Sequence, residues 1–285
     1  MTIRKLLLGT SGWGYPEWRG PFYPHNLRQE LFLSFYSEIF PVVEINMSFY
    51  RMPSVKMVKR WDQSTQADFL FAAKIPRVIT HDSKLQGNDW QGKLTTYLEI
   101  MDRLGKKLGP SLLQLPPSFT AKEIAHLEAF LAEWPARLKV AVEFRHKSWL
   151  ADGESSPVFS LLDKYDAAYC IVSEPLLPPL LGPTTAEFSY VRWHGFGKKI
   201  WYDYDYSEEE IAQWVPKINE LSSTNQVFGF FNNHYRGNAV KNCQTMQEML
   251  GEQPTHPHEV DYQAVLRKAG RKQPKTKTLE AWLPK

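Results

Sequence analysis

The sequence predicts a single (β/α)₈ barrel of the TIM type over residues 1–250, followed by a short C-terminal extension over 251–285. Eight short apolar runs rich in β-branched and aromatic residues recur along the chain, and helical patterns lie between most of them. Strands that alternate with helices form parallel sheets, and eight such repeats in about 250 residues fit a closed barrel. A doubly wound open sheet is the rival fold. No Gly-x-Gly-x-x-Gly motif follows the first run, which disfavours a dinucleotide-binding sheet.

The predicted strands and helices follow one another in a regular order. The strands are expected over residues 5–12, 42–49, 68–75, 111–116, 139–145, 167–173, 187–195 and 226–233. The helices are expected over residues 26–39, 54–64, 89–107, 120–133, 157–166, 207–222 and 238–250, with one more over 259–269. The last segment, 270–278, is basic and contains proline, a composition typical of mobile tails.

Charge and composition exclude several classes of protein. The net charge of +3 resides in the extension, which has seven basic and four acidic residues, so the body is neutral. A neutral body gives no support for bulk electrostatic binding to nucleic acid, although a local basic groove remains open. The two cysteines, Cys170 and Cys243, have no metal-ligand spacing and are expected to be reduced core thiols of a cytoplasmic protein. No run approaches the ~20 apolar residues of a membrane helix, so no membrane partner is expected.

Polar residues gather at the C-terminal ends of the predicted strands, where TIM barrels place their chemistry. In the stretch AVEFRHKSW, Glu143 and Arg145 point to the same face because strand side chains alternate. The strand-end candidates for a ligand site are Trp13, Glu44, Asn46, Lys74, Gln114, Glu143, Arg145, Arg192, His194 and Asn232. A single Glu–Arg pair is better explained as a satisfied structural network. Polar groups at seven or eight strand ends favour a shared ligand site at the barrel mouth.

An ordered series of sequence blocks resembles a known family. The blocks are GTSGWGYPEWRGPFYP, VEINMSFYRMPS, FAAKIPRVITH, GPSLLQLPPSF, VEFRHKSW, YVRWHG and FFNNHYRGNAVKNC. They are similar to the bacterial and archaeal family called domain of unknown function 72, over about residues 5–250. The resemblance implies a TIM-type barrel and no settled activity. That barrel is distantly similar to the endonuclease IV and sugar isomerase group, which is an analogy of fold alone.

The eighth block predicts a phosphate or phosphodiester site. In NNHYRGNAVKN, the chain passes from a strand through Gly237 into a helix expected to begin near Asn238. Asparagine is a good N-cap, and the free amides of a first helical turn attract anions. Arg236 lies close by, and loops after strands seven and eight often hold phosphate in TIM barrels. Asn233 joins this candidate site; an ordinary glycine-containing loop with a capped helix is the alternative.

The candidate chemistry is acid–base catalysis of a hydrolytic, phosphodiester type. Glu44 and Glu143 are candidate general base and acid, with His194 or His81 as alternative proton carriers. The cationic side chains at the mouth are Lys74, Arg145 and Arg192. They are expected to stabilise the negative charge that develops during the reaction. Two inward carboxylates also suit a glycosidase. These glutamates and histidines lack local metal-ligand spacing, so no cofactor is predicted and a divalent metal is a minority alternative.

The expected partner is a phosphorylated small molecule or a nucleic acid. Trp13 is the best candidate for stacking on a base or sugar, since aromatics beside a mouth do so in other proteins. A non-catalytic nucleic-acid-associated protein and a carbohydrate-active enzyme are the alternative functions. In the tail, TKTLEAWL resembles a sliding-clamp-binding peptide through Leu279, Trp282 and Leu283, with Thr276 where glutamine is expected. A terminal turn that packs on its own barrel is the simpler interpretation.

Overall fold

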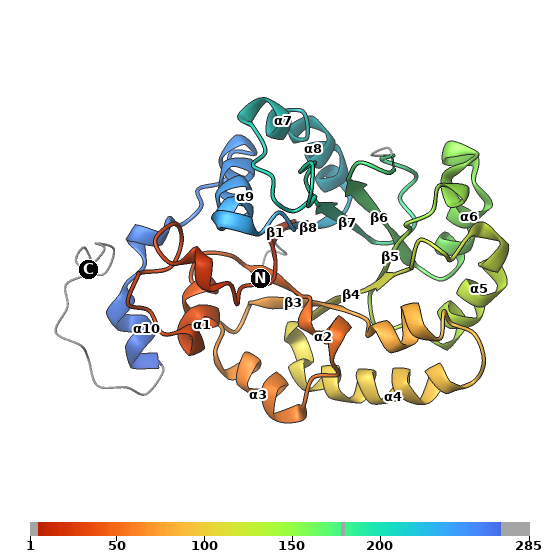
Figure 1. Cartoon of the computed structure of the whole chain (residues 1–285), viewed down its shortest axis with the longest axis horizontal. Coiled ribbons are helices and arrows are strands. Elements are labelled where there is room, and N and C mark those ends of the chain that lie inside the picture. The colour runs from red at the N-terminus through yellow and green to blue at the C-terminus, as the bar shows by residue number, and fades with distance from the viewer. Residues whose placement is uncertain (1–4, 178–179, 269–285) are drawn as a thin grey trace.

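Eight parallel strands close into a barrel in sequence order, with β8 beside β1 (Figure 1). The computed structural model describes residues 5–177 and 180–268. The strands are β1 (Leu6–Ser11), β2 (Val42–Ile45), β3 (Leu70–Lys74), β4 (Leu108–Gln114), β5 (Val140–Glu143), β6 (Ala167–Ser173), β7 (Phe188–Trp193) and β8 (Gln226–Phe231). This closed sheet confirms the predicted (β/α)₈ barrel.

Helices surround the strands on the outside of the barrel (Figure 1). They are α1 (Phe32–Tyr36), α2 (Met47–Tyr50), α3 (Val55–Gln63), α4 (Asp89–Met101), α5 (Ile124–Glu133), α6 (Pro157–Lys164), α7 (Glu208–Ala212), α8 (Val215–Thr224), α9 (Asn238–Met249) and α10 (Tyr262–Lys268). Helix α10 belongs to the predicted extension and contacts α1. The sliding-clamp motif lies outside the described residues and stays a prediction.

Several predicted elements differ in extent from the observed ones. The strand expected over 42–49 ends at Ile45, and its last residues form α2. The helix expected over 26–39 is a 3₁₀ turn followed by the five residues of α1. The helix expected over 207–222 is two helices, α7 and α8. Pro216 lies in the first turn of α8. Proline has no amide hydrogen, so it is tolerated in the first turn of a helix but disfavoured inside one, and a new helix begins here.

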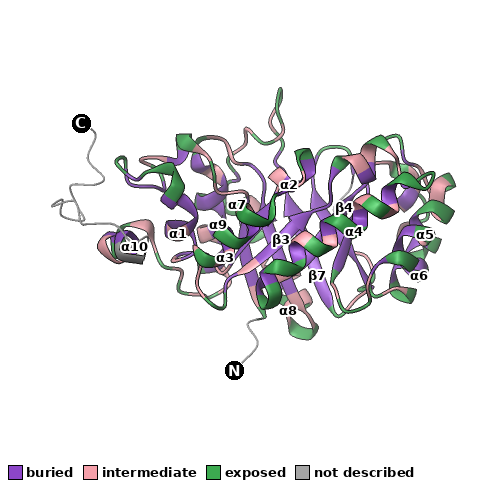
Figure 2. Ribbon diagram, turned by 90° about the horizontal axis from the view of Figure 1, so that it is seen from below, coloured by how far each residue is buried: buried purple, intermediate pink, exposed green. Residues whose placement is uncertain are grey.

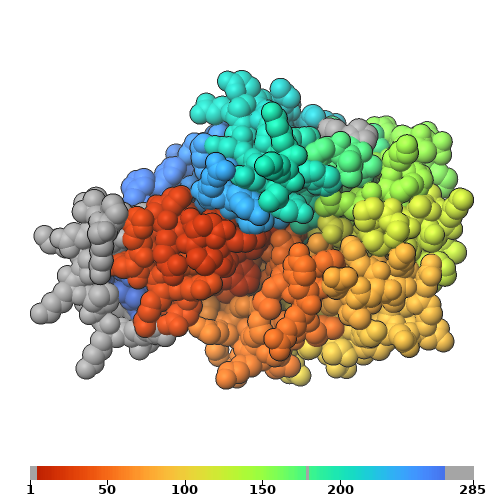
Figure 3. Space-filling model, viewed as in Figure 1, coloured from red at the N-terminus to blue at the C-terminus, as the bar shows by residue number. Residues whose placement is uncertain are grey.

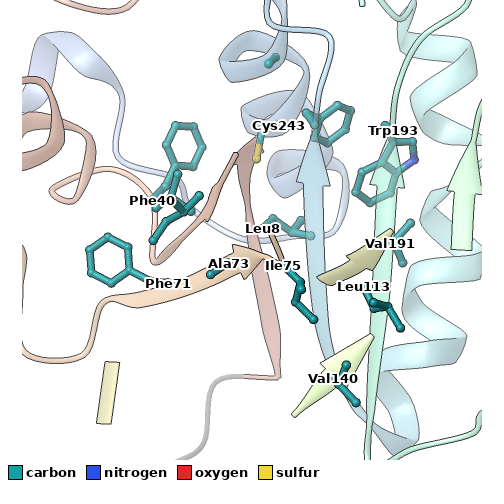
Figure 4. Close-up of a cluster of buried hydrophobic side chains, with 14 of the residues drawn as sticks. Leu8, Phe40, Phe71, Ala73, Ile75, Leu113, Val140, Val191, Trp193 and Cys243 are labelled. Carbon is teal, nitrogen blue, oxygen red and sulfur yellow. The ribbon is translucent and has the colours of Figure 1, made fainter. Parts of the chain in front are cut away.

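The apolar core has two layers, one inside the barrel and one between strands and helices. Alternation along each strand separates them, so Val42 points inward while Val43 and Ile45 point to the helices. The outer layer packs side chains such as Leu8 of β1 and Cys243 of α9 (Figure 4). Figure 2 shows the strands buried along most of their length, with exposed residues on the outer faces of the helices.

The C-terminal ends of all eight strands open on one side because the strands are parallel. In Figure 2, α2 lies at the upper end of the strands, where it follows β2 directly. In the space-filling view, early segments in red and orange meet later segments in teal and blue around the middle of the molecule (Figure 3). Loops from both halves of the chain therefore contribute to this end of the barrel.

Candidate functional site

Seven strands end in, or are followed at once by, a polar side chain that continues the inward face of the barrel. On each of these strands, the residue two positions earlier is apolar or aromatic and belongs to the interior core. The seven polar residues are Glu44, Lys74, Gln114, Glu143, Glu174, Arg192 and Asn232. The alternation that buries the core therefore also stacks a polar layer on top of it, as the sequence predicted.

Arg192 is fully buried between two carboxylates of this layer. Its Nη2 atom lies 2.7 Å from Oε1 of Glu44, and its Nη1 atom lies 2.5 Å from Oε2 of Glu143. The hydroxyl of Tyr190 donates a hydrogen bond of 2.7 Å to the other oxygen of Glu44. Gln114 donates one of 2.8 Å to the other oxygen of Glu143. A buried guanidinium needs such partners, because an unpaired buried charge is strongly destabilising.

Arg145 extends the network toward the surface. Its Nη2 atom lies 2.5 Å from Oε1 of Glu143, and its Nη1 atom donates to Oε2 of Glu174. Glu174 follows β6 directly and was not among the predicted site residues. Burial raises the pKa of Glu174, and its second oxygen, Oε1, is buried with no hydrogen-bond partner among the described residues. Sequence position at a strand end is the signal by which Glu174 could have been found.

The contacts of Glu143 define its charge. Burial by itself would raise its pKa, but the guanidiniums of Arg145 and Arg192 outweigh burial and hold the pKa well below the usual range of a glutamate. Both of its oxygens already accept hydrogen bonds from these cations and from Gln114. An ionised carboxylate in this state has no proton to donate, so its contacts favour positioning Arg192 over general acid catalysis.

His194 sits in the same network as a neutral imidazole. Its Nδ1 atom lies 2.9 Å from the amide nitrogen of Asn232, and its Nε2 atom lies 3.1 Å from Nη2 of Arg145. Burial, followed by the charges of Arg145 and Arg192, lowers the pKa of His194 to about 3. At neutral pH this side chain is therefore uncharged and acts in the network only as a hydrogen-bonding group.

Lys74 differs from the other cations of the mouth. Its Nζ atom lies 4.0 Å from the centre of the Phe49 ring, and the part of the chain that the structure describes places no carboxylate within ion-pair distance of it. Burial, followed by the charge of Arg192, lowers the pKa of Lys74 to about 7, although Glu143 and Glu44 act in the opposite direction. This amine is thus divided between its charged and neutral forms near neutral pH.

These groups surround one open cavity of about 460 Å³ at the barrel mouth. Its walls are formed by Tyr15, Asn46, Phe49, Tyr50, Lys74, Arg77, His81, Gln114, Arg145, Arg192, His194, Tyr202, Asn232 and His234. Eight of these fourteen are predicted site residues, drawn together from most of the strands. The volume lies in the range of ordinary small-molecule sites.

The remaining six lining residues come from loops and from α2 rather than from strand ends. Tyr15 is an example: its hydroxyl donates to the carbonyl of Ser11 at 2.7 Å, and its ring stacks on His234 with centroids 4.6 Å apart. Arg77 lies just beyond β3, directly before the π-helical turn over Val78–Asp82 that carries the predicted His81. Loop geometry of this kind follows no short sequence period, so the alternation argument cannot find it.

Glu44 and Glu143 lie behind Arg192 instead of in the cavity wall, and two other predicted residues point away from it. Trp13 packs edge-on against Trp61 of α3, with ring centroids 5.9 Å apart, outside the cavity. Asn233 is buried and donates to the carbonyl of Tyr204 at 2.9 Å. The structure therefore supplies Tyr15, rather than Trp13, as an aromatic face at the mouth.

The predicted phosphate site after β8 is separate from the cavity. Arg236 points to Asp203, with Nη2 and Oδ2 3.3 Å apart, and Asn238 donates from its side chain to the carbonyl of Tyr204 at 3.1 Å. Gly237, with φ of +81°, caps α9 in place of Asn238, because the turn requires a left-handed residue there. Arg236, Gly237 and Asn238 line a separate surface pocket, so they do not contribute to the cavity at the barrel mouth.

The described residues contain neither a cluster of metal ligands nor a membrane-spanning helix. Within residues 5–177 and 180–268, no three His, Cys, Asp or Glu side chains are grouped as the ligands of a metal ion. The helices of the same residues include none with the length and apolar character needed to cross a membrane.

Comparison with known proteins identifies the family. The family model described as protein of unknown function DUF72 matches residues 7–265. The chain belongs to the DUF72 family. The resemblance inferred from the sequence blocks is confirmed, and the DUF72 match extends beyond residue 250 into α10.

Relatives and solved structures agree with DUF72 membership. The UPF0759 protein YunF of Bacillus subtilis is 28% identical over 275 residues, covering 86% of this chain and 94% of YunF. The UPF0759 protein YecE of Escherichia coli is 32% identical over 150 residues, about half of each chain (52% of both). The crystal structure of a DUF72 protein from Thermotoga maritima has a TM-score of 0.75 at 32% identity, covering 87% of this chain and 100% of that one.

Proposed function

We propose that the barrel mouth binds a small phosphate-bearing ligand and carries out acid–base chemistry on it. The observation that carries this proposal is the Lys74 amine, which faces the cavity beside the guanidiniums of Arg145 and Arg192 without a carboxylate of its own. Burying an ammonium group without a counter-ion is unfavourable. Loss of its proton or binding of an anion removes this cost. A phosphate group supplies that anion and hydrogen-bonds to guanidinium edges as well.

The dimensions and the rim of the cavity indicate the rest of the ligand. A volume of about 460 Å³ suits a sugar phosphate or a mononucleotide. Tyr15, His234 and Tyr202 form a continuous stack, with centroid distances of 4.6 Å and 5.7 Å, along one side of the cavity. Tyr50, which is 74% exposed, lies on the rim as well. Flat faces of this kind pack on a sugar or a base, so the end of a nucleic acid strand fits the same description.

Proton transfer falls to Lys74 and His81 in this proposal. A pKa of about 7 gives Lys74 both protonation states near neutral pH, which is the condition for efficient acid–base catalysis. Burial, followed by the charge of Lys74, lowers the pKa of His81 to about 4, so His81 is an uncharged proton acceptor. Glu44 and Glu143 hold Arg192 in place, and no contact favours the two-carboxylate arrangement of a glycosidase.

Isothermal titration calorimetry with matched ligands tests the proposal. Ribose 5-phosphate is expected to bind and ribose to bind at least about tenfold more weakly, a difference of about 1.4 kcal/mol. Lys74→Met is expected to weaken ribose 5-phosphate at least about tenfold, while Arg236→Gln, outside the cavity, is expected to leave it unchanged. Equal binding of both sugars overturns the phosphate assignment. A deoxynucleotide and a ten-nucleotide single strand, titrated in the same way, distinguish a small ligand from a nucleic acid end.

Turnover separates an enzyme from a binding protein. Phosphorylated ligands that bind are incubated with the wild-type chain and with Lys74→Met, and product is followed by phosphorus NMR. The proposal expects conversion in the wild type and loss in the variant. Binding without any conversion in the wild type makes the chain a non-catalytic binding protein.

A further inference from the structure

We propose that Lys74 forms a covalent imine with a carbonyl group of the ligand, which makes the substrate a phosphate-bearing aldehyde or ketone. This inference deepens the proposed function and rests on it. Three independent features of the structure support it: the placement of the amine, the neutral histidine beside it, and the pairing of every other cation in the cavity wall.

The amine is held in place at the floor of the cavity. Lys74 is the last residue of β3, and its carbonyl accepts a hydrogen bond of 2.6 Å from the hydroxyl of Ser48. Its Nζ atom lies over the Phe49 ring at 4.0 Å, and the side chain is largely buried, with the residue 8% exposed. A lysine fixed against an apolar ring and open to a cavity is the arrangement that imine-forming enzymes use.

The other cationic groups of the wall are occupied, which sets Lys74 apart. Arg192 pairs with Glu44 and Glu143, and Arg145 with Glu143 and Glu174. At the rim, Arg77 pairs with Asp82, with Nη2 and Oδ1 3.0 Å apart. A structural lysine would be expected to have such a partner as well. Among the described residues, Lys74 has no ion-pair partner. In the neutral form, its nitrogen lone pair is therefore not taken up by a hydrogen bond or an ion pair to any of these residues.

Burial has the largest effect on Lys74 and lowers its pKa to about 7. The charged groups around it come from three other strands and act in both directions. Arg192 of β7 and Arg145 after β5 oppose its protonation, while Glu143 of β5 and Glu44 of β2 support it. A large fraction of the amine is therefore nucleophilic at neutral pH, whereas an exposed lysine is almost entirely protonated.

His81 is placed to carry the proton that imine formation moves. It packs edge-on against the same Phe49 ring, with centroids 4.8 Å apart, so it and Lys74 share a neighbour. Its Nδ1 atom lies 2.8 Å from the hydroxyl of Thr80, which leaves Nε2 for the cavity. The residue lies in the π-helical turn over Val78–Asp82, shortly after β3, and such turns are frequent at functional sites.

The covalent step is balanced without a further reagent. The nitrogen lone pair of Lys74 attacks the carbonyl carbon, and a C–N bond forms as the C–O π bond breaks. The nitrogen loses a proton and the oxygen gains one, which gives a carbinolamine. The C–O bond then breaks, and the oxygen takes a second proton from solvent and leaves as water, so that an iminium ion remains. One water molecule is released and nothing is oxidised or reduced.

Reductive trapping of the full-length chain tests the inference. The protein is incubated with dihydroxyacetone phosphate or glyceraldehyde 3-phosphate and sodium cyanoborohydride, and the product is analysed by intact mass and peptide mapping. A single adduct on the peptide containing Lys74, with a labelling midpoint near pH 7, is expected. Lys74→Arg is expected to remove that adduct, while Lys59→Arg, on the exposed face of α3, is expected to leave it unchanged. An adduct spread over surface lysines overturns the inference.

The outcomes distinguish this inference from the proposed function. If the phosphorylated probes bind by calorimetry and no adduct forms on Lys74, the imine is overturned and the phosphate site stands. Unphosphorylated dihydroxyacetone that labels Lys74 as fast as its phosphate overturns the phosphate site and supports the amine. Because the adduct is mapped on the wild-type protein, the test does not depend on the folding of any variant.

Discussion

Glu44 and Arg192 lie 148 positions apart in the sequence, and their side chains meet inside the barrel with Oε1 and Nη2 2.7 Å apart. Both side chains are essentially inaccessible to solvent. Their pairing joins β2 to β7 across the barrel and forms the base of the polar layer at the mouth. Glu143 completes the arrangement from β5, so that one guanidinium connects three strands.

Removal of Arg192 is expected to destabilise the protein strongly. Arg192→Met leaves Glu44 buried without a cation and Glu143 with Arg145 alone, which costs about 3–5 kcal/mol. Urea unfolding followed by tryptophan fluorescence measures the change. Arg137→Met, which removes an exposed pair with Asp102, is the control and is expected to cost about 1 kcal/mol or less. A similar small cost for both variants would contradict the role given to the buried network.

The lowered pKa of Lys74 predicts a pH dependence of stability. The pKa of Lys74 is about 7 in the folded chain and 10.5 in the unfolded chain. Between these two pH values the unfolded chain binds more protons than the folded chain. This group therefore makes the free energy of unfolding rise with pH. Lys74→Met removes the contribution. Relative to the wild type, the variant is therefore expected to be most stable below pH 7 and to lose this advantage toward pH 10.5. Urea unfolding across this range measures it; a constant difference would refute the lowered pKa.

His194 is expected to remain neutral well into the acid range. Burial and the two neighbouring arginines lower its pKa to about 3, so its imidazole nitrogens should show no titration between about pH 5 and 8. Nitrogen-15 NMR of histidine-labelled protein detects this directly, with His194→Gln used to assign the signal. A titration midpoint near 6.5 for this residue would mean that the imidazole is exposed or differently paired.

Two glycines offer opposite predictions for stability. A Cβ atom on Gly9 of β1 would lie 2.2 Å from the backbone carbonyl oxygen of Val42, so Gly9→Ala must displace a strand and is expected to cost about 1–3 kcal/mol. Gly92 lies in α4 with no atom near its would-be Cβ, and Gly92→Ala is expected to stabilise by about 0.5–1 kcal/mol. Thermal unfolding of the two variants is the measurement. Equal shifts would show that close strand approach at Gly9 is unimportant.

The barrel and its polar mouth could be predicted from sequence because both follow from alternation along strands. Lys74, Gln114 and Arg192 each continue an inward face, so their convergence needs only parallel strands and a closed ring. Chain direction and period alone carry that information. The same reasoning found seven of the fourteen residues of the cavity wall; His81, the eighth predicted one, was not a strand-end candidate.

Loop positions were beyond this reasoning for a physical reason. Trp13 and Tyr15 are two residues apart after β1, and only the packing of Trp13 on Trp61 decides which of them faces the cavity. The cap of α9 depended in the same way on a backbone angle: Gly237 adopts positive φ and displaces Asn238 from the capping position. Such choices are made by tertiary contacts and turn geometry, which no periodic pattern encodes.

The central claim is that an anion binds inside the barrel mouth beside Lys74. Crystals soaked in tungstate, a phosphate analogue with a strong anomalous signal, test it most directly. The account predicts an anomalous peak within hydrogen-bonding distance of the Lys74 amine and a guanidinium of Arg145 or Arg192, and no peak in crystals of Lys74→Met. A peak only at Arg236 and the start of α9, with an empty mouth, would contradict it.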